Sequence, residues 1–425
     1  MVYCPEGIIT ILLYVFVGMT KAVPELSMVA NMAAVLVLLY LTYKDKLLFA
    51  APLFLFFNSS ILYYYGVAVA DIFFALFILN EIVRRPKIKV KYIHIIFIIF
   101  CVYSLFVVSA FNKMLSIEII LIYLFVIFLL QHVSNQKKWD EFAFWYLVGL
   151  FAASIYGLSS WTENMALGDT RRYMLAFTDP NYAGMFLSIG FYLVYCKKNI
   201  SRILKVSLMM AIGIEILLTM SSTAILCNIL VLSLLMVDKG INIIRNKAYS
   251  IKLRTIAAIG IFFLMGMLAV SYIQKNPDTI IADSVDRFVQ KVSNIGSGMG
   301  DATTGRSDIW KEHLLFFENQ DSMIKKILGG NFVTDRGVDR QFFKIVSHEV
   351  YIDSLLCFGI VGTLIYIGAI IKQLFYKWKN RHCSDMNRQI WCIAVIWLVY
   401  SFGLSMFPFW GFAFMLFVNP SNEGD

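Results

Sequence analysis

Apolar residues in this chain come in long, nearly uncharged runs rather than in alternating positions. Examples are residues 93–111, 203–220 and 350–371. Each run is close to the roughly 20 residues that a helix needs to cross the hydrocarbon core of a bilayer. Because only a helix satisfies its own backbone hydrogen bonds within such a run, the pattern predicts an all-α integral membrane protein and not a barrel.

Polar residues divide the sequence into about 14 apolar spans, judged against a template of roughly 20 residues. Their approximate limits are 8–20, 26–43, 47–64, 66–83, 92–111, 115–131, 141–159, 174–196, 203–220, 222–237, 254–273, 348–371, 389–406 and 407–418. The first and last are short, so the predicted fold is a polytopic bundle of about 12 to 14 transmembrane helices. The first run has no basic leader and no small-residue cleavage pattern, and we expect it to be a retained span.

The longest polar stretch lies late in the chain, at residues 274–347. Loops of this length without a function are uncommon, so we expect it to fold. Within it, Ser307 can cap a helix with an apolar face that could lie on the membrane surface. The apolar residues of that helix are Ile309, Trp310, Leu314 and Phe317. The chain is therefore predicted to have three parts: a bundle at 1–273, the large loop at 274–347, and the rest of the bundle at 348–425.

Composition and charge agree with this fold class. Hydrophobic residues make up 59% of the chain and charged residues 15%, whereas soluble globular chains carry roughly 25% charged residues. Cytoplasmic loops of membrane proteins are enriched in lysine and arginine, which identifies the inner gaps between spans and predicts that both termini are cytoplasmic and the large loop is outside. Most basic residues fall in the gaps at 44–46, 84–91, 137–138, 197–205, 239–254 and 372–388. The net charge of +9 thus follows from topology and gives no reason to expect nucleic acid as a partner.

Cysteine and acidic residues give no sign of a metal or cofactor. The seven cysteines form no Cys-x-x-Cys pair, and none lies in the large loop. The chain also has no Asp-x-Asp sequence. We therefore expect neither a disulfide framework nor a metal site.

The first candidate for chemistry is a pair of arginines, Arg171 and Arg172, on the predicted outer side. Asp179-Pro180-Asn181 follows, at the start of the eighth span. Outer arginines break the positive-inside pattern. An arginine fork binds phosphate oxygens in a bidentate way, and the amides of a helix that starts at Pro180 would add positive potential. Alternatively, the two arginines contact lipid headgroups or pair with Asp169.

Two further constellations lie in and after the large loop. Arg306 precedes the predicted loop helix and could face an anionic group, although a solvated arginine at a helix start is the more common case. His348 is followed by Glu349, Tyr351 and Asp353 at the predicted water–membrane boundary. A histidine beside carboxylates suits proton transfer near neutral pH, although a lone interfacial histidine is more often structural. Asp353 lies about one helical turn deeper, where a carboxylate needs a partner or a function.

Acidic residues inside the predicted spans allow two interpretations. Asp71, Glu118 and Glu215 could mark a proton or ion path. They could equally form hydrogen bonds between helices, and because each predicted span carries only one such residue, we favour this second interpretation.

In this order and at these places in the topology, the constellations resemble those of the O-antigen polymerase and ligase superfamily of bacterial surface-polysaccharide assembly. The similarity covers residues 140–405, and it includes an arginine and a Pro-Asn pair at an outer span start and a Gly-Arg-x-x-x-Trp segment. The family's loop end, His-x-x-Tyr-x-x-x-Leu-x-x-x-Gly-x-x-Gly, corresponds to His348, Tyr351, Leu355, Gly359 and Gly362. Ile327-Leu328-Gly329-Gly330-Asn331 is similar to a Leu-Gly-x-Gly turn.

One difference concerns the end of the span near residue 220. Many relatives carry Ser-Arg-Gly after a Leu-Thr pair there, whereas this chain reads Leu218-Thr219-Met220-Ser221-Ser222. The basic residue at this place is missing. Either Arg172 and Arg306 supply enough positive charge without it, or a basic residue of the large loop takes its place, such as Arg336, Arg340 or Lys344.

The resemblance implies a GT-C-like glycosyltransferase of the bacterial inner membrane with its active face outside. It would transfer an undecaprenyl-diphosphate-linked glycan to a lipid-linked repeat unit, with inversion and without metal. The implied catalytic residues are His348, Arg172 and Arg306. The implied substrate-binding residues are Arg171, Asp179, Asn181, Glu349, Tyr351, Arg336 and Arg340. Implied partners are the lipid-linked oligosaccharide, membrane lipid, a chain-length regulator and a flippase.

Two alternatives stay open. A ligase of the same superfamily would pass the finished chain to lipid A core. A flippase or another secondary transporter would also be polytopic and basic, but transporters usually show internal repeats and charges near the bilayer midplane. We see no repeat in this sequence and rank the polymerase first and the ligase second.

Overall fold

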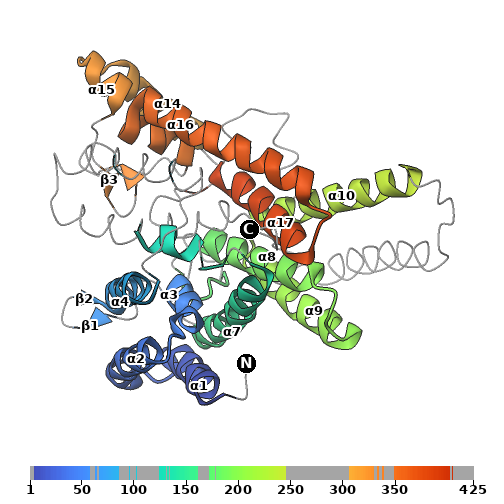
Figure 1. Ribbon diagram of the computed structural model, residues 1–425. Coiled ribbons are helices and arrows are strands. Elements are labelled where there is room, and N and C mark those ends of the chain that lie inside the picture. Colours follow the sequence, from blue (N-terminus) through green and yellow to red (C-terminus); the bar gives the residue numbers. More distant parts are fainter. Residues whose placement is uncertain are drawn as a thin grey trace, which may run out of the picture.

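The chain is helical in the parts that the structure describes, apart from two pairs of very short strands (Figure 1). The computed structural model describes residues 4–57, 63–64, 67–85, 95, 102, 124–130, 132–133, 135–160, 172–177, 179–245, 306–329, 333–334, 337–338, 349–402 and 404. The strand pairs are β1 (Tyr63–Tyr64) with β2 (Val67–Ala68), and β3 (Val333–Thr334) with β4 (Gly337–Val338), both antiparallel. The predicted helical fold class is thereby confirmed at this coarse level.

The N-terminal helices pack around one long helix. They are α1 (Pro5–Met19), α2 (Leu26–Tyr43), the 3-10 turn η1 (Leu47–Phe49), α3 (Ala51–Phe56), α4 (Val69–Arg84) and α7 (Gln136–Ser160). Helices α1 and α3 pack on α7, and α2 packs on α1 and α4. The predicted span at 26–43 matches α2. The span predicted at 47–64 is not one helix, because η1 and α3 end at Phe56 and Tyr63–Tyr64 is a strand.

The C-terminal helices include α17 (Asp385–Ser401), whose residues 389–397 are all buried. The others are α8 (Pro180–Cys196), α9 (Arg202–Leu218), α10 (Ser222–Arg245), α14 (Arg306–Glu318), α15 (Met323–Leu328) and α16 (Val350–Asn380). Helix α8 packs on α9, α10 and α17, while α14 and α15 pack on α16. The predicted span at 174–196 begins late, because 172–177 is not helical and Pro180 opens the helix.

Three described helical segments are long and apolar enough to cross a membrane: Leu26–Tyr43, Gln136–Ser159 and Phe358–Asn380. Large apolar side chains point outward from two of them. Leu36 on α2 is 65% exposed, and Phe375 on α16 is 71% exposed. Water-soluble monomers rarely expose contiguous apolar faces of this kind. The helices are therefore those of a protein that associates with a membrane.

Helix α16 reverses direction at Gly359, which has φ 63° and ψ −170°. Thr363 Oγ1 donates to Ser354 Oγ at 3.4 Å, and the rings of Tyr351 and Tyr366 are 6.4 Å apart. In a straight helix with a rise of 1.5 Å per residue, nine residues already separate two positions by about 13 Å. Residues 350–358 therefore form a half-helix that folds back along the first turns of the long part of α16.

The span predicted at 348–371 is corrected accordingly. It was expected to be one helix that enters the membrane at His348, whereas the crossing segment begins at Phe358 and runs to Asn380. Glycine has no Cβ, so Gly359 adopts the left-handed conformation that the reversal needs. We call 350–358 the half-helix and Gly359 its tip.

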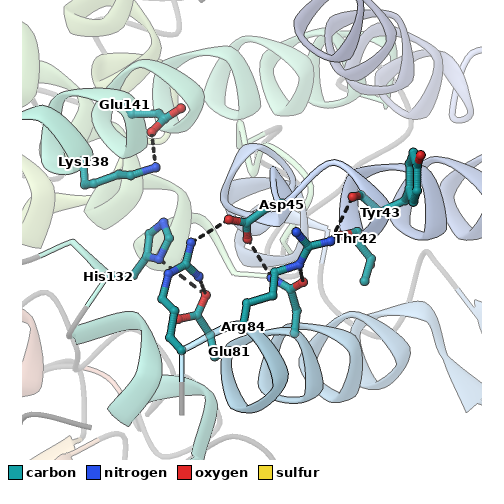
Figure 2. A network of polar contacts seen from close by, with 10 residues as sticks. Thr42, Tyr43, Asp45, Glu81, Arg84, His132, Lys138 and Glu141 are labelled. Carbon is teal, nitrogen blue, oxygen red and sulfur yellow. Dashed lines mark hydrogen bonds and ion pairs between the residues drawn. The ribbon is translucent and has the colours of Figure 1, made fainter. Parts of the chain in front are cut away.

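Polar side chains join the C-terminal ends of α2 and α4, as Figure 2 shows. Arg84 Nη2 donates to the carbonyls of Thr42 and Tyr43 at 3.3 and 2.9 Å. Asp45 accepts from Asn80 Nδ2 at 2.9 Å and from Arg85 Nη2 at 2.7 Å. His132 Nδ1 lies 3.5 Å from Glu81 Oε1, and Lys138 Nζ lies 3.0 Å from Glu141 Oε2. These residues come from three gaps predicted to be cytoplasmic, or border them.

Ion pairs tie the other predicted inner gaps together in the same way. Lys197 Nζ lies 2.5 Å from Asp140 Oδ1, and Lys198 Nζ lies 3.3 Å from Asp385 Oδ1. Arg381 donates to Asp238 Oδ1 from Nε at 3.0 Å and from Nη2 at 2.6 Å. The basic gaps that the sequence assigns to one side of the membrane are thus joined to one another in space.

Candidate functional site

Arg172 lies across the C-terminal end of α9. Its Nε donates to the carbonyl of Thr219 at 3.1 Å, and its Nη2 donates to the carbonyl of Met220 at 3.3 Å. The amide of Tyr173 donates to the carbonyl of Leu218 at 3.0 Å. Cations at this end of a helix are favoured by the helix dipole and by the carbonyls left without intrahelical partners. The plane of the guanidinium group is thereby fixed, and the side chain is half-buried.

The segment that carries Arg172 is also held from the side by α7 and α9. Glu215 Oε2 accepts from Ser154 Oγ at 2.7 Å and from the hydroxyl of Tyr173 at 3.4 Å. A methyl group on Gly157 would lie 2.7 Å from Leu175 Cα, so only glycine allows this approach. Glu215 therefore joins helices through hydrogen bonds, which is the interpretation that the sequence favoured. Glu118 lies outside the described residues.

The start of α8 meets the start of α10. Asp179 caps α8 by accepting from the amide of Asn181 at 2.7 Å. Ser221 Oγ donates to Asn181 Oδ1 at 2.7 Å and accepts from the amide of Ala224 at 3.2 Å. The predicted helix start at Pro180 is confirmed. The chain's own Asp179 carboxylate occupies the position where the sequence suggested a bound anion.

Glu349 caps the half-helix by accepting from the amide of Ile352. Glu349 is nearly buried, and Asp353, one turn further, is fully buried. Burial raises the pKa of Glu349 to about 7; bonds to the amides of Ile352 and Tyr351 oppose this shift, and the nearby charge of Asp353 adds to it. Tyr351 shares a hydrogen bond with Ser401 Oγ at 2.9 Å, at the end of α17. A carboxyl group that titrates near neutral pH thus lies at the N-terminus of the half-helix.

These groups belong to one region of the protein. The segment 219–221 connects them, since Arg172 bonds to its first two residues and Asn181 to the third. Tyr351 is joined to Ser401 at the end of α17, and α17 packs on both α8 and α10, which places the half-helix in the same region. We define the candidate site by these residues: Arg172, Asp179, Asn181, Ser221, Glu349, Tyr351 and Asp353.

Two glycines from separate sequence motifs also meet. A methyl group on Gly359 would overlap the backbone at Ile327 and Gly329. Gly329 itself has φ 82° and ends α15. The turn in the large loop and the tip of the half-helix are therefore in direct contact, which fixes the loop helices relative to the candidate site.

Several predicted site residues are not placed. Arg171, Arg336, Arg340 and His348 lie outside the described residues. Helix α14 begins at Arg306, so Ser307 lies inside the helix and is not its cap as predicted; the side chain of Arg306 is not among those described. Sequence reasoning did not assign Ser221 to the site. Ser221 could have been found as the cap of the tenth span, because serine is a preferred residue at a helix start.

Within the described part of the chain, no group of three or more histidine, cysteine or acidic side chains is arranged to hold a metal ion. The site instead combines a guanidinium group, a carboxyl group that titrates near pH 7, and hydroxyl and amide groups. Such a set can bind an anionic oxygen and move a proton. No model of a known protein family matches the chain, and no curated protein matches it.

Proposed function

We propose that this chain is a polymerase of a bacterial surface polysaccharide, O-antigen or a similar glycan. It would be a polytopic, GT-C-like glycosyltransferase of the inner membrane, with both termini in the cytoplasm and the candidate site facing outward. Its donor is a glycan on undecaprenyl diphosphate, and its acceptor is a lipid-linked repeat unit. The motifs that resemble the polymerase and ligase superfamily suggest this reaction.

The position of Arg172 is the observation that carries the proposal. Many relatives carry Ser-Arg-Gly after the Leu-Thr pair near residue 220, and this chain has no arginine there. Arg172 comes from another segment, and its guanidinium group lies on the carbonyls of Thr219 and Met220. A cationic side chain thus lies at the end of the same helix, although it comes from a different segment of the chain. This supports the view that the difference from the family pattern is compensated.

The residues of the site suit transfer from a diphosphate. The acceptor hydroxyl attacks C1 of the donor sugar, and the bond from C1 to the phosphate oxygen breaks with its electron pair going to the diphosphate. Arg172 stabilises that leaving charge in place of a metal ion. The proton of the acceptor hydroxyl goes to the imidazole of His348. Glu349, next in the sequence, changes charge near neutral pH and so influences that imidazole.

The arrangement of charges supports the proposed sidedness. The basic gaps assigned to the cytoplasm are joined by ion pairs such as Lys197 with Asp140 and Arg381 with Asp238. Arg172 lies at the opposite end of α9 from Arg202, and Glu349 belongs to the half-helix whose tip is at the opposite end of the crossing segment from Arg381. A donor on an outward-facing polyprenyl carrier would meet them on the other side of the membrane.

The test uses a strain that lacks this chain and is complemented with variants. Arg172→Ala should leave surface glycan with a single repeat unit, a loss of polymerisation on the order of 100-fold or more, as for other oxyanion-binding groups. His348→Ala should give the same profile. Arg202→Ala is the matched control, because Arg202 is exposed at the other end of α9 and should keep the full ladder of chain lengths.

The amount of each variant in the membrane is measured by immunoblot, so that loss of protein is not mistaken for loss of activity. A normal ladder from both Arg172→Ala and His348→Ala would remove these residues from the mechanism. Complete loss of attached glycan in the deletion strain, single repeats included, would identify a ligase instead.

A further inference from the structure

Helix α15 exposes almost all of its apolar side chains. Met323 and Ile324 are 69% and 70% exposed, and Ile327 and Leu328 are each 41% exposed. Between them lie Lys325, which is exposed, and Lys326, and residues 323–328 contain no acidic side chain. A short helix that combines exposed apolar side chains with lysines is suited to the boundary between lipid headgroups and acyl chains.

The contact between α15 and α16 places α15 at a defined height. The crossing segment Phe358–Asn380 is 23 residues long, which corresponds to about 35 Å of helix and spans a hydrocarbon core of about 30 Å. Its far end carries Lys377, Lys379 and then Arg381. Its near end is the tip, Gly359, where Ile327 and Gly329 are in contact. The end of α15 is therefore level with the point where the crossing helix leaves the bilayer.

Helix α14 does not present the apolar face that its sequence suggested. His313 is buried, and Phe316 and Phe317 pack against the core. Leu314 and Leu315 are 40% and 46% exposed, on the outward side. Leu314 and Leu315 share that side of α14 with the exposed charged residues Asp308, Lys311 and Glu318, so the apolar surface is that of α15 alone.

We propose that α15 is seated in the headgroup layer of the bilayer at the tip side, with Met323, Ile324, Ile327 and Leu328 inserted and the two lysines on anionic phospholipid headgroups. The lysines supply the charge that such headgroups attract. This surface holds the tip, and through it the half-helix that folds back along the crossing segment, at a fixed height relative to the bilayer. The proposal rests on the crossing by α16 and not on glycan chemistry.

The experiment places a photoreactive phenylalanine derivative at Ile324 of the full chain, reconstituted in vesicles of equimolar phosphatidylethanolamine and phosphatidylglycerol. Because Ile324 is exposed, the folded chain should accept the larger side chain. After irradiation, mass spectrometry should find phospholipid attached to residue 324. The same derivative at Glu312, an exposed position on α14, is the matched control and should capture little lipid.

A second arm tests the lysines. Lys325→Gln and Lys326→Gln should each lower the ratio of phosphatidylglycerol to phosphatidylethanolamine captured at residue 324, by up to about fivefold per lysine. Cross-links between two copies of the chain at residue 324, equal lipid capture at 312, or no capture at all would overturn the proposal. Glycan polymerisation is not part of the readout, so failure here is separate from failure of the proposed function.

Discussion

Glu349 has two physical roles that act against each other. Its carboxylate caps the half-helix, which favours the charged form, while burial favours the neutral form and wins. Its pKa in the folded chain is about 7, above its ordinary value. Because the folded chain binds this proton more tightly than the unfolded chain does, protonation of Glu349 adds to the free energy of unfolding, fully so below the ordinary pKa. That contribution is lost as the pH rises through about 7. Folding and proton uptake at this residue are therefore linked.

We expect Glu349→Gln to remove this dependence. The amide cannot ionise, but its oxygen can still accept from the amide of Ile352. Unfolding temperatures of the purified chain in detergent are compared at about pH 5 and about pH 8. The wild type should lose on the order of a few kcal/mol over this range through Glu349, and the variant should not. Glu312→Gln, an exposed control, should behave as the wild type. An unchanged pH profile in Glu349→Gln would contradict the assignment.

For single residues, the sequence predicted which side chains belong to the candidate site better than it predicted what those side chains contact. Arg172 was a candidate because an arginine on the predicted outer side breaks a charge rule, and that rule is visible in the sequence. Its contact with Thr219 and Met220 was not predictable, because it joins segments 47 and 48 residues apart. Asp179 was expected near substrate, and the structure uses its carboxylate as a helix cap.

At the scale of elements, the reversal in α16 depends on Gly359. The glycine has a left-handed backbone, φ 63°, and its Hα side faces the backbone at Ile327 and Gly329. A single residue thus permits both the turn of the half-helix and the close approach of α15. Backbone strain and overlap would act together on any larger residue.

Gly359→Ala should therefore destabilise the chain, by about 1–3 kcal/mol from backbone strain and further from overlap with α15. Gly368→Ala is the matched control in the same helix, since a methyl group there would have nothing within 4 Å. It should leave stability unchanged or raise it by up to about 1 kcal/mol, because alanine is the better helix former. Thermal unfolding in detergent measures both. Equal stability of the two variants would show that the tip is not tightly packed.

The sequence located most helices but not this reversal. The span predicted at 26–43 coincides with α2, because polar residues mark both of its ends. Residues 350–371 form one apolar run, and an apolar run gives no sign of a change in direction while both halves are buried or in lipid. The polar residues Asp353 and Ser354 within that run were the available sign of the reversal. A half-helix can bury such groups against the helix along which it folds back.

At the scale of the whole molecule, charge is sorted along the helices. Basic residues of the predicted cytoplasmic gaps pair with acids of neighbouring gaps, as Lys198 does with Asp385 and Arg85 with Asp45. These pairs are partly exposed, and each contributes little to stability. The pairs instead fix which helix ends lie next to one another. Each pair joins two ends that the charge rule assigns to the same side of the membrane.

This sorting predicts which face of the membrane each loop occupies. Cys383 is an exposed native cysteine in the turn between α16 and α17, next to Arg381 and His382, and should face the cytoplasm. Glu318 ends α14 in the large loop and should face outward. In spheroplasts, a membrane-impermeant maleimide should label Glu318→Cys, made together with Cys383→Ser, and should not label Cys383 in the wild type. After lysis both should react, and Cys383→Ser alone gives the background from the other cysteines. Labelling of Cys383 in intact spheroplasts would invert the topology and place Arg172 and Glu349 on the cytoplasmic side, where a donor on an outward-facing carrier cannot reach them.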